Sequence, residues 1–211
     1  MISESATIHP NVKLGKNCII QDFVIIGILP KGYNAGDIKT VIGDNAIIRS
    51  HTVIYGGNKI SSNFQTGHHV MIREFNEIGN NVSIGTNSVI EHHIKIANNV
   101  RIHSNAFIPE FSILKTKVWI GPNVVLTNSY HPLCPKAKEC LKGPTIYKNA
   151  KIGANATILP DIKIGENSLI GAGSVVVKDV PPNVVVAGNP AKIIKKIGEL
   201  KCPYNLILRP Y

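Results

Sequence analysis

The chain has 211 residues, of which 44% are hydrophobic and 6% aromatic, and its formal net charge is +10. A basic chain favours an anionic partner or substrate, but no aromatic stacking platform or recognised motif points to a nucleic acid. No stretch approaches the ~20 apolar residues of a membrane span, and the first residues lack a basic region followed by an apolar run. We therefore expect a cytoplasmic protein without a membrane span.

The four cysteines, Cys18, Cys134, Cys140 and Cys202, are scattered along the chain without a paired pattern. In a chain without an export signal, cysteines are normally kept reduced. We therefore expect free thiols and no structural disulfide.

An aliphatic residue recurs at every sixth position from the start of the chain, and residues 28–41, rich in Gly, Pro and Asn, interrupt this repeat. The repeat resumes at Ile42 and holds to Leu126, with Thr66 as its one exception. A helical period of 3.6 would lose this phase within two repeats, and a simple strand would alternate at two and then stop. A strict short period over this length predicts a coiled parallel β-solenoid, in which each repeat supplies one short strand and one corner.

A second interruption covers residues 127–145, and the repeat then runs from Ile146 to Val176. After Pro190 a basic tail has apolar residues at a helical spacing, Ile193, Ile194, Ile197 and Leu200. We expect one β-helix domain over 1–192, with protruding loops at 28–41 and 127–145, and a short helical tail over 193–211.

The other positions of each six-residue unit are also restricted. Glycine often follows the aliphatic residue, and asparagine often stands three residues after it. Both residue types tolerate left-handed backbone angles and therefore suit a tight corner. This pattern resembles that of the hexapeptide-repeat acyltransferases over nearly the whole chain, from Ile8 to Lys192. The resemblance implies an all-β, left-handed parallel β-helix with three units, or 18 residues, per coil, and a homotrimer.

Residues 18 apart should then stack on one corner of adjacent coils. This places His51 against His69, and Phe75, His93 and Phe111 in one column. Stacked histidines could hold zinc, as in the related gamma-class carbonic anhydrases, but the histidine spacing of those enzymes is absent and a zinc site needs a convergent ligand set. We expect no metal, and keep a zinc enzyme and a non-catalytic solenoid scaffold as alternatives.

The segment from Val118 to Pro132 resembles the galactoside and xenobiotic acetyltransferases, in which a histidine before a proline begins a loop and acts as the general base. By this match His131 is the catalytic base, because a neutral imidazole can remove a proton from an acyl acceptor near pH 7. Thr127 and Asn128, and the run from Thr66 to Glu74, instead resemble the nucleotide-sugar N-acetyltransferases. The acceptor is therefore expected to be a sugar or nucleotide-linked sugar, with O- or N-acetylation left open.

The block from Ile152 to Lys192 resembles the family's coenzyme A site, where small residues let the pantetheine arm approach the backbone. The resemblance implies acetyl-CoA as the co-substrate and assigns its binding to Gly153, Ala154, Gly171 and Ala172, with Lys178 and Lys192 on its phosphates. Candidate residues for the acceptor pocket are Tyr33, His103, Asn105 and Asn128.

Overall fold

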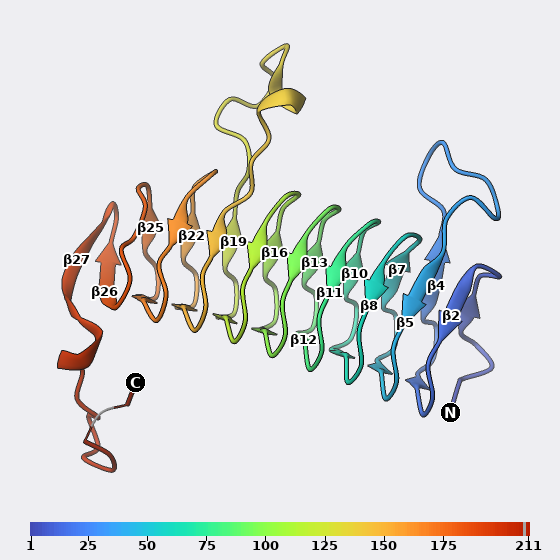
Figure 1. The fold of residues 1–211 in the computed structure, drawn as a ribbon, viewed down its shortest axis with the longest axis horizontal. Coiled ribbons are helices and arrows are strands. Elements are labelled where there is room, and N and C mark those ends of the chain that lie inside the picture. Colours follow the sequence, from blue (N-terminus) through green and yellow to red (C-terminus); the bar gives the residue numbers. More distant parts are fainter. Residues whose placement is uncertain (209) are drawn as a thin grey trace.

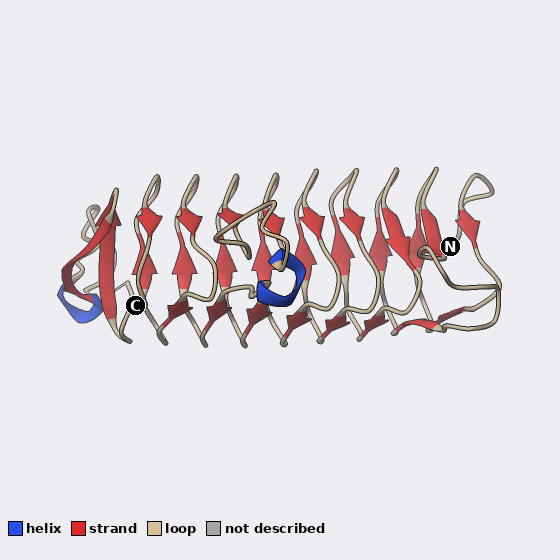
Figure 2. Ribbon diagram, turned by 90° about the horizontal axis from the view of Figure 1, so that it is seen from above, coloured by secondary structure: helices blue, strands red, loops and turns tan. Residues whose placement is uncertain are grey.

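The computed structural model describes residues 1–208 and 210–211 and confirms the predicted left-handed parallel β-helix (Figure 1). Most strands have two residues, and in the regular part of the repeat partners on successive coils are 18 residues apart, as in Met71 opposite Val89. Three sheets form the faces of the prism, parallel except for one antiparallel pairing near the C-terminus, and the coils stack along its long axis (Figure 2).

The strands of the three sheets alternate regularly along the chain. The nine-stranded sheet contains β1 (Thr7–Ile8), β4 (Ile25–Ile28), β7 (Val53–Tyr55), β10 (Met71–Ile72), β13 (Val89–Ile90), β16 (Phe107–Ile108), β19 (Val125–Leu126), β22 (Thr157–Ile158) and β25 (Val175–Val176). The eight-stranded sheet contains β2 (Val12–Leu14), β5 (Thr40–Ile42), β8 (Lys59–Ile60), β11 (Glu77–Ile78), β14 (Lys95–Ile96), β17 (Ile113–Leu114), β20 (Thr145–Ile146) and β23 (Lys163–Ile164). The ten-stranded sheet contains β3 (Ile19–Ile20), β6 (Ile47–Ile48), β9 (Gln65–Thr66), β12 (Ser83–Ile84), β15 (Arg101–Ile102), β18 (Trp119–Ile120), β21 (Lys151–Ile152), β24 (Leu169–Ile170), β26 (Val184–Gly188) and β27 (Ala191–Lys196).

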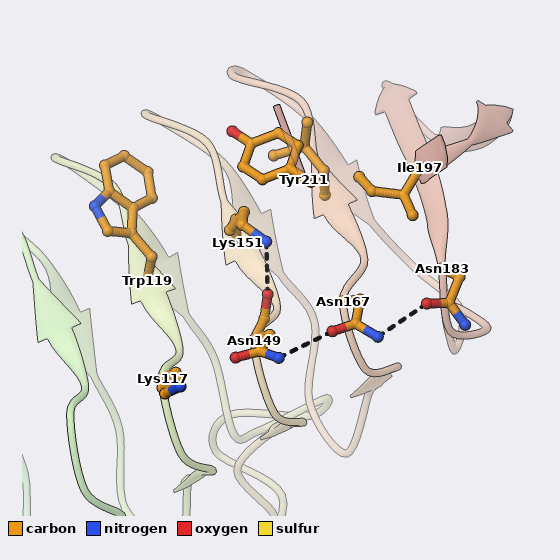
Figure 3. A pocket seen from close by; sticks show the side chains of 9 residues that line it. Lys117, Trp119, Asn149, Lys151, Asn167, Asn183, Ile197 and Tyr211 are labelled. Carbon is orange, nitrogen blue, oxygen red and sulfur yellow. Dashed lines mark hydrogen bonds between the residues drawn. The ribbon is translucent and has the colours of Figure 1, made fainter. Parts of the chain in front are cut away.

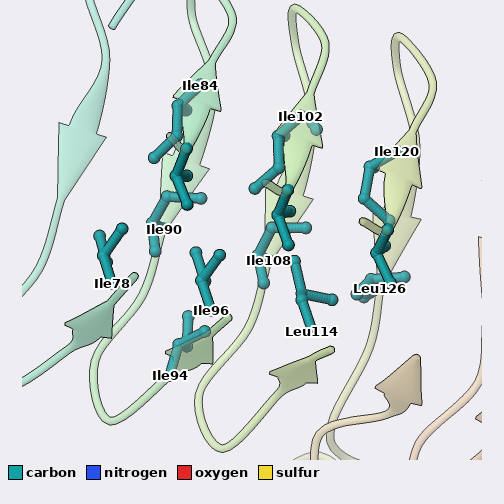
Figure 4. Packing of buried hydrophobic residues seen from close by; sticks show 14 of the residues in the cluster. Ile78, Ile84, Ile90, Ile94, Ile96, Ile102, Ile108, Leu114, Ile120 and Leu126 are labelled. Atoms are coloured by element: carbon teal, nitrogen blue, oxygen red, sulfur yellow. The ribbon is translucent and has the colours of Figure 1, made fainter. Parts of the chain in front are cut away.

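The core is a stack of the aliphatic residues that recur at every sixth position (Figure 4). Ile84, Ile90 and Ile102 are each at most 2% exposed, because the second residue of each short strand points inward. The one polar exception, Thr66, is also buried, and its hydroxyl accepts a hydrogen bond from the backbone N–H of Arg49 at 2.9 Å. The repeat therefore tolerates threonine where its hydroxyl has a partner.

The corner between the eight- and ten-stranded sheets, here the asparagine corner, carries a ladder of Asn side chains. Asn63 donates to Asn81, and Asn81 donates to Asn99, at 2.9 and 3.1 Å. These residues have φ between +57° and +60°, the left-handed region that asparagine tolerates. The predicted role of asparagine at the corners is confirmed. The same prediction is wrong for the glycines that follow the aliphatic residues, because only Gly27 among them has a left-handed φ.

Both interruptions of the repeat leave the prism at one corner, between the nine- and eight-stranded sheets (Figure 1). We call it the loop corner. The first loop joins β4 to β5 over 29–39, and the second joins β19 to β20 over 127–144 and contains the 3₁₀ turn η1 (Ala137–Cys140). The third corner, between the ten- and nine-stranded sheets, is called the alanine corner because it holds Ala154 and Ala172.

The prediction of a helical tail over 193–211 is wrong for residues 193–196, which belong to β27 (Ala191–Lys196), antiparallel to β26. Only η2 (Ile197–Glu199) is helical there, as one 3₁₀ turn. The edge of β26 has unpaired backbone groups that a strand can satisfy, and this requirement outweighs the helical spacing. Ile193 and Ile194 remain 59% and 56% exposed, so their spacing does not reflect burial.

All four cysteines are free, as expected. Among the described residues, no helix reaches the length and apolarity needed to cross a bilayer.

Candidate functional site

At the alanine corner, the backbone N–H groups of Ala154 and Ala172 have no acceptor among the described residues, and the same holds for Thr86 and Ser104 on earlier coils. At the same position of an earlier coil, the N–H of His68 donates to Thr86 Oγ1 at 3.2 Å. Alanine has no such oxygen, so Ala172 cannot satisfy the N–H of Ala154. The two coils therefore carry adjacent donors at a partly exposed corner, and such donors can bind a carbonyl or an oxyanion.

The neighbouring glycines are explained by the coil spacing alone. A Cβ at Gly153 would lie 2.5 Å from the backbone nitrogen of Ala172, and one at Gly171 would lie 2.9 Å from Ala187 Cβ. The close approach that excludes a side chain here is that of the next coil, so the presence of glycine does not by itself indicate a ligand.

The two lysines predicted to meet phosphates lie at different places. Lys192 pairs with Ala187 in the β26–β27 ladder, beside the alanine corner. Lys178 follows β25 and stands on the loop corner, across the nine-stranded sheet. Both side chains belong to exposed residues.

His131 lies on the second protruding loop and is exposed. The base of this loop is tied to the prism by Asn128 Nδ2, which donates to Glu110 Oε2 at 2.5 Å, and by the Tyr130 hydroxyl, which donates to the carbonyl of Pro160 at 2.6 Å. The imidazole of His131 has no hydrogen-bond partner among the described residues. Asn128 and Tyr130, which precede His131 by three residues and one residue, are held in place, while the His131 ring is exposed.

The predicted acceptor residues fall into two groups. Tyr33 on the first loop packs on Phe75 with ring centroids 5.4 Å apart, so it belongs to the loop corner with Asn128. His103 and Asn105 stand on the alanine corner, where Asn105 has the φ of +59° common to corner asparagines.

His103 borders a pocket of about 250 Å³ that is also lined by Arg49 and Arg101. Its Nε2 is buried without a hydrogen-bond partner among the described residues, and its ring packs on Trp119 at 4.7 Å. Burial lowers the pKa of His103 below its ordinary value, and Arg101 lowers it further. A neutral imidazole with an unsatisfied nitrogen can bind a polar ligand group.

One chain does not bring the predicted site residues together. One edge of the nine-stranded sheet, at the alanine corner, carries His103, Asn105 and the predicted coenzyme residues except Lys178. The other edge, at the loop corner, carries His131, Asn128 and Tyr33.

From the sequence, His92 and His93 are considered only as possible zinc ligands, and no catalytic role is predicted for them or for Glu110 on the loop corner. His92 Nε2 lies 3.4 Å from Glu110 Oε1, and His92 Nδ1 lies 2.8 Å from His93 Nδ1. A signal was present, because Glu74, His92, Glu110 and Asn128 are spaced by 18 residues. The same spacing confirms the predicted stack of His51 on His69, at 4.7 Å, and the column of Phe75, His93 and Phe111.

Beside the histidines, Arg73 forms ion pairs with Glu74 at 2.9 Å and with Glu91 at 3.3 Å. Burial is the largest single influence on the pKa of Glu74 and raises it. The hydrogen bond from Arg73, a backbone hydrogen bond and the charges of Arg73 and His92 together outweigh burial, and the pKa lies below its ordinary value. Burial raises the pKa of Glu91, and the nearby Glu110 adds to this against the opposing charge of Arg73. The described residues contain no group of three or more His, Cys, Asp or Glu side chains that could hold a metal ion, so the zinc alternative gains no support.

A separate pocket of about 670 Å³ lies on the outer face of the ten-stranded sheet, between the asparagine ladder and the tail (Figure 3). Trp119 and Lys151 line its floor, and Lys151 Nζ lies 4.2 Å from the centroid of the Tyr211 ring. Burial lowers the pKa of Lys151. None of the predicted site residues lines this pocket.

Comparison with known proteins agrees with the fold and the repeat. The model of the bacterial transferase hexapeptide (six repeats) family matches residues 77–110 and 143–178. The galactoside O-acetyltransferase of Escherichia coli is 46% identical over 86 residues, which are 39% of this chain and 42% of that enzyme. The 2,3,4,5-tetrahydropyridine-2,6-dicarboxylate N-acetyltransferase of Clostridium perfringens is 48% identical over 82 residues, 39% of this chain and 32% of that enzyme.

These matches span less than half of the curated relatives' own length. A solved structure of a Bacillus cereus protein, to which an acetyltransferase activity is assigned, is 30% identical to this chain with a TM-score of 0.55. The match covers 66% of this chain and 77% of the Bacillus cereus chain. The relatives are named as enzymes, which favours an enzyme over the scaffold considered above. The chain belongs to the bacterial transferase hexapeptide family.

Proposed function

We propose that the protein is an acetyl-CoA-dependent acetyltransferase that acts on a hydroxyl or amino group of a sugar or nucleotide-linked sugar. The observation that carries this proposal is the pair of free N–H donors of Ala154 and Ala172 on adjacent coils. The relatives reported above differ in acceptor, a galactoside in one and a dicarboxylate in the other, and share the acetyl group in their names. Acetyl-CoA as the acetyl donor is therefore better supported than the identity of the acetyl acceptor.

In this proposal the pantetheine arm of acetyl-CoA lies along the alanine corner, beside Gly153 and Gly171. A pantetheine amide or the thioester carbonyl accepts hydrogen bonds from the open N–H groups, and Lys192 at the same corner meets a phosphate. A donor that points at the thioester oxygen also stabilises the negative charge that this oxygen gains as the acceptor attacks.

His131 is proposed as the general base that removes the proton of the acceptor. Its ring is exposed on a loop whose base is fixed by Asn128 and Tyr130. The acceptor oxygen or nitrogen forms a bond to the acetyl carbon, the carbon–sulfur bond breaks, and the coenzyme A thiolate takes up the proton. Tyr33 and Asn128 are proposed to contact the sugar from the loop corner, and His103 and Asn105 from the alanine corner.

A homotrimer would complete this site. The free N–H groups and His131 lie on opposite edges of the nine-stranded sheet of one chain, so the alanine corner of one copy must meet the loop corner of another. Lys178, which stands on the loop corner, would then reach the coenzyme of a neighbouring copy. The four free cysteines fit a reducing compartment, and we propose the cytoplasm.

The base assignment can be tested with His131→Ala, assayed for coenzyme A release with a panel of sugars, amino sugars and nucleotide sugars. We expect a loss of about 10²- to 10⁴-fold in kcat, typical of a missing general base. The matched control is Leu133→Ala, because Leu133 lies on the same loop and is 99% exposed. Full activity of His131→Ala would contradict the assignment of His131 as the base and would leave the proposed acetyl-CoA site at the alanine corner untouched.

A further inference from the structure

Two adjacent imidazoles on the loop corner are connected in series to a carboxylate. Glu110 Oε1 lies 3.4 Å from His92 Nε2, and His92 Nδ1 lies 2.8 Å from His93 Nδ1. The side chains of His92 and Glu110 are 26% and 23% exposed, so water only partly competes for these contacts. The other oxygen of Glu110 accepts from Asn128, at the base of the loop that carries His131.

The contact of His92 Nε2 with Glu110 is an ion-pair contact, and together with the hydrogen bond between the two histidines it favours one placement of the protons. An ionised carboxylate only accepts, so the nitrogen of His92 that faces Glu110 carries the hydrogen. The Nδ1 of a neutral His92 is then an acceptor and must receive the N–H of His93 Nδ1. This leaves the lone pair of His93 on Nε2, with no partner among the described residues.

The environment of His93 keeps this lone pair available. The His93 ring lies between Phe75 and Phe111, with centroid distances of 5.3 and 5.8 Å. Burial lowers the pKa of His93 below its ordinary value and the adjacent His92 lowers it further, while Glu74 opposes them. The imidazole is therefore neutral near pH 7 and can accept a proton.

The charges around this imidazole favour a cation. Glu74, Glu91 and Glu110 face the histidines from three successive coils, and Arg73 is the cation paired among them. With neutral histidines the group has three negative charges against one positive charge, in a chain whose net charge is +10. This net negative charge attracts a protonated amine, whereas it contributes little to the binding of an uncharged hydroxyl group.

We propose that His93, positioned by His92 and Glu110, is a catalytic residue that deprotonates a primary ammonium group, so that the acetyl acceptor is an amino sugar. The inference rests on the proposed acetyltransferase function and specifies its acceptor. The phenyl rings beside His93, with Tyr33 on Phe75, form an apolar strip on which a sugar ring can pack.

The chemistry requires two proton acceptors for an amine. His93 Nε2 removes one proton from the ammonium group, and the freed lone pair of the amine attacks the carbonyl carbon of the thioester. The carbon–nitrogen bond forms, the carbon–sulfur bond breaks, and a second proton leaves the nitrogen for His131. One of the two protons ends on the coenzyme A thiol and the other passes to solvent, so that atoms and charge balance. A hydroxyl acceptor would lose only one proton and would not need the second base.

The kinetic test compares His93→Asn with His69→Asn on pairs of nucleotide sugars that differ only in an amino or hydroxyl group. Asparagine suits both positions, because each has a positive φ and asparagine occupies other corners. We expect the wild type to prefer the amine, and His93→Asn to lose about 10²- to 10⁴-fold in kcat on it. His69→Asn should keep wild-type rates. Unchanged kcat in His93→Asn, or preference for the hydroxyl, would overturn the inference.

Glu110→Gln tests the positioning role. A carboxylate stabilises the protonated form of the histidines and an amide does not, so the base should have a lower pKa in this variant. The acid limb of the pH profile of kcat/KM should therefore move to lower pH, and kcat should fall. A pH profile identical to that of the wild type would contradict this role.

Nitrogen-15 NMR of the histidine side chains gives a readout that does not depend on activity. At neutral pH we expect His92 protonated on Nε2 and His93 on Nδ1. The opposite tautomers would overturn the relay even if acetyl transfer occurs. A wild type that shows these tautomers but releases no coenzyme A with any acceptor would contradict the proposed function, and the catalytic role of His93 with it.

Discussion

Gly153 lies so close to Ala172 on the next coil that a Cβ atom at Gly153 would come within 2.5 Å of the Ala172 backbone nitrogen. Backbone atoms cannot give way as the end of a flexible side chain can. Gly153→Ala should therefore destabilise the fold by about 1–3 kcal/mol, the usual cost of overpacking. Urea unfolding measures this loss of stability. Gly198→Ala is the control, because no neighbouring atom lies within 4 Å of a Cβ added at Gly198. Equal midpoints for the two variants would contradict the steric explanation.

The asparagine corner predicts a difference between two substitutions of Asn81. Asn81→Ala loses two side-chain hydrogen bonds and places alanine at a φ of +57°. The left-handed conformation costs an L-residue other than Gly, Asn or Asp about 1–2 kcal/mol. Asn81→Gly loses the same bonds without this strain and should be more stable than Asn81→Ala by about 1 kcal/mol. Urea midpoints that coincide would show that the ladder, and not the backbone angle, selects asparagine.

Glu74 should make the fold sensitive to acid. Its pKa is lowered in the folded state, so its contribution to stability is present above the unfolded value, ~4.3, and is lost as the pH falls through the folded value. Glu74→Gln removes this contribution, and its free energy of unfolding should fall less between about pH 5 and pH 3 than that of the wild type. Glu77→Gln, on an exposed strand position, should follow the wild-type curve. A Glu74→Gln curve parallel to that of the wild type would refute the coupling to Arg73.

The open N–H of Ala154 predicts the effect of adding a hydroxyl to the next coil. Ala172→Thr places Oγ1 where Thr86 Oγ1 accepts from His68, so the N–H of Ala154 becomes occupied. The fold should keep its stability, while acetyl-CoA binds about tenfold more weakly, which is the loss of one hydrogen bond. Calorimetry measures the affinity, and Ser62→Thr, at the equivalent position of the asparagine corner, is the control. Undiminished affinity in Ala172→Thr would exclude the Ala154 amide from the donor site.

Much of the fold could be predicted from the sequence because each regular coil has 18 residues. This spacing placed His51 on His69 and Phe75 beside His93, and both contacts are present. The tail could not be predicted in this way, because Ile193 and Ile194 fit a helical spacing while the free edge of β26 requires a strand.

The roles assigned to the candidate site residues stay predictions, and the way these residues are distributed over the corners did not follow from the sequence. Asn105 and Asn128 appear close in the sequence, but they follow different strands of a coil and therefore stand on different corners. Joining them requires a second copy of the chain, which the repeat does not describe. The Glu110–His92 contact followed the repeat spacing, but the direction of each imidazole nitrogen depends on packing beside Phe111.

Titration of acetyl-CoA into the wild-type chain, followed by mass spectrometry of an amino-sugar nucleotide incubated with both, tests the central claim most directly. We predict saturable acetyl-CoA binding and an acceptor mass increased by one acetyl group, with both signals reduced in Ala172→Thr. Absence of acetyl-CoA binding to the wild type would contradict the acetyltransferase account as a whole.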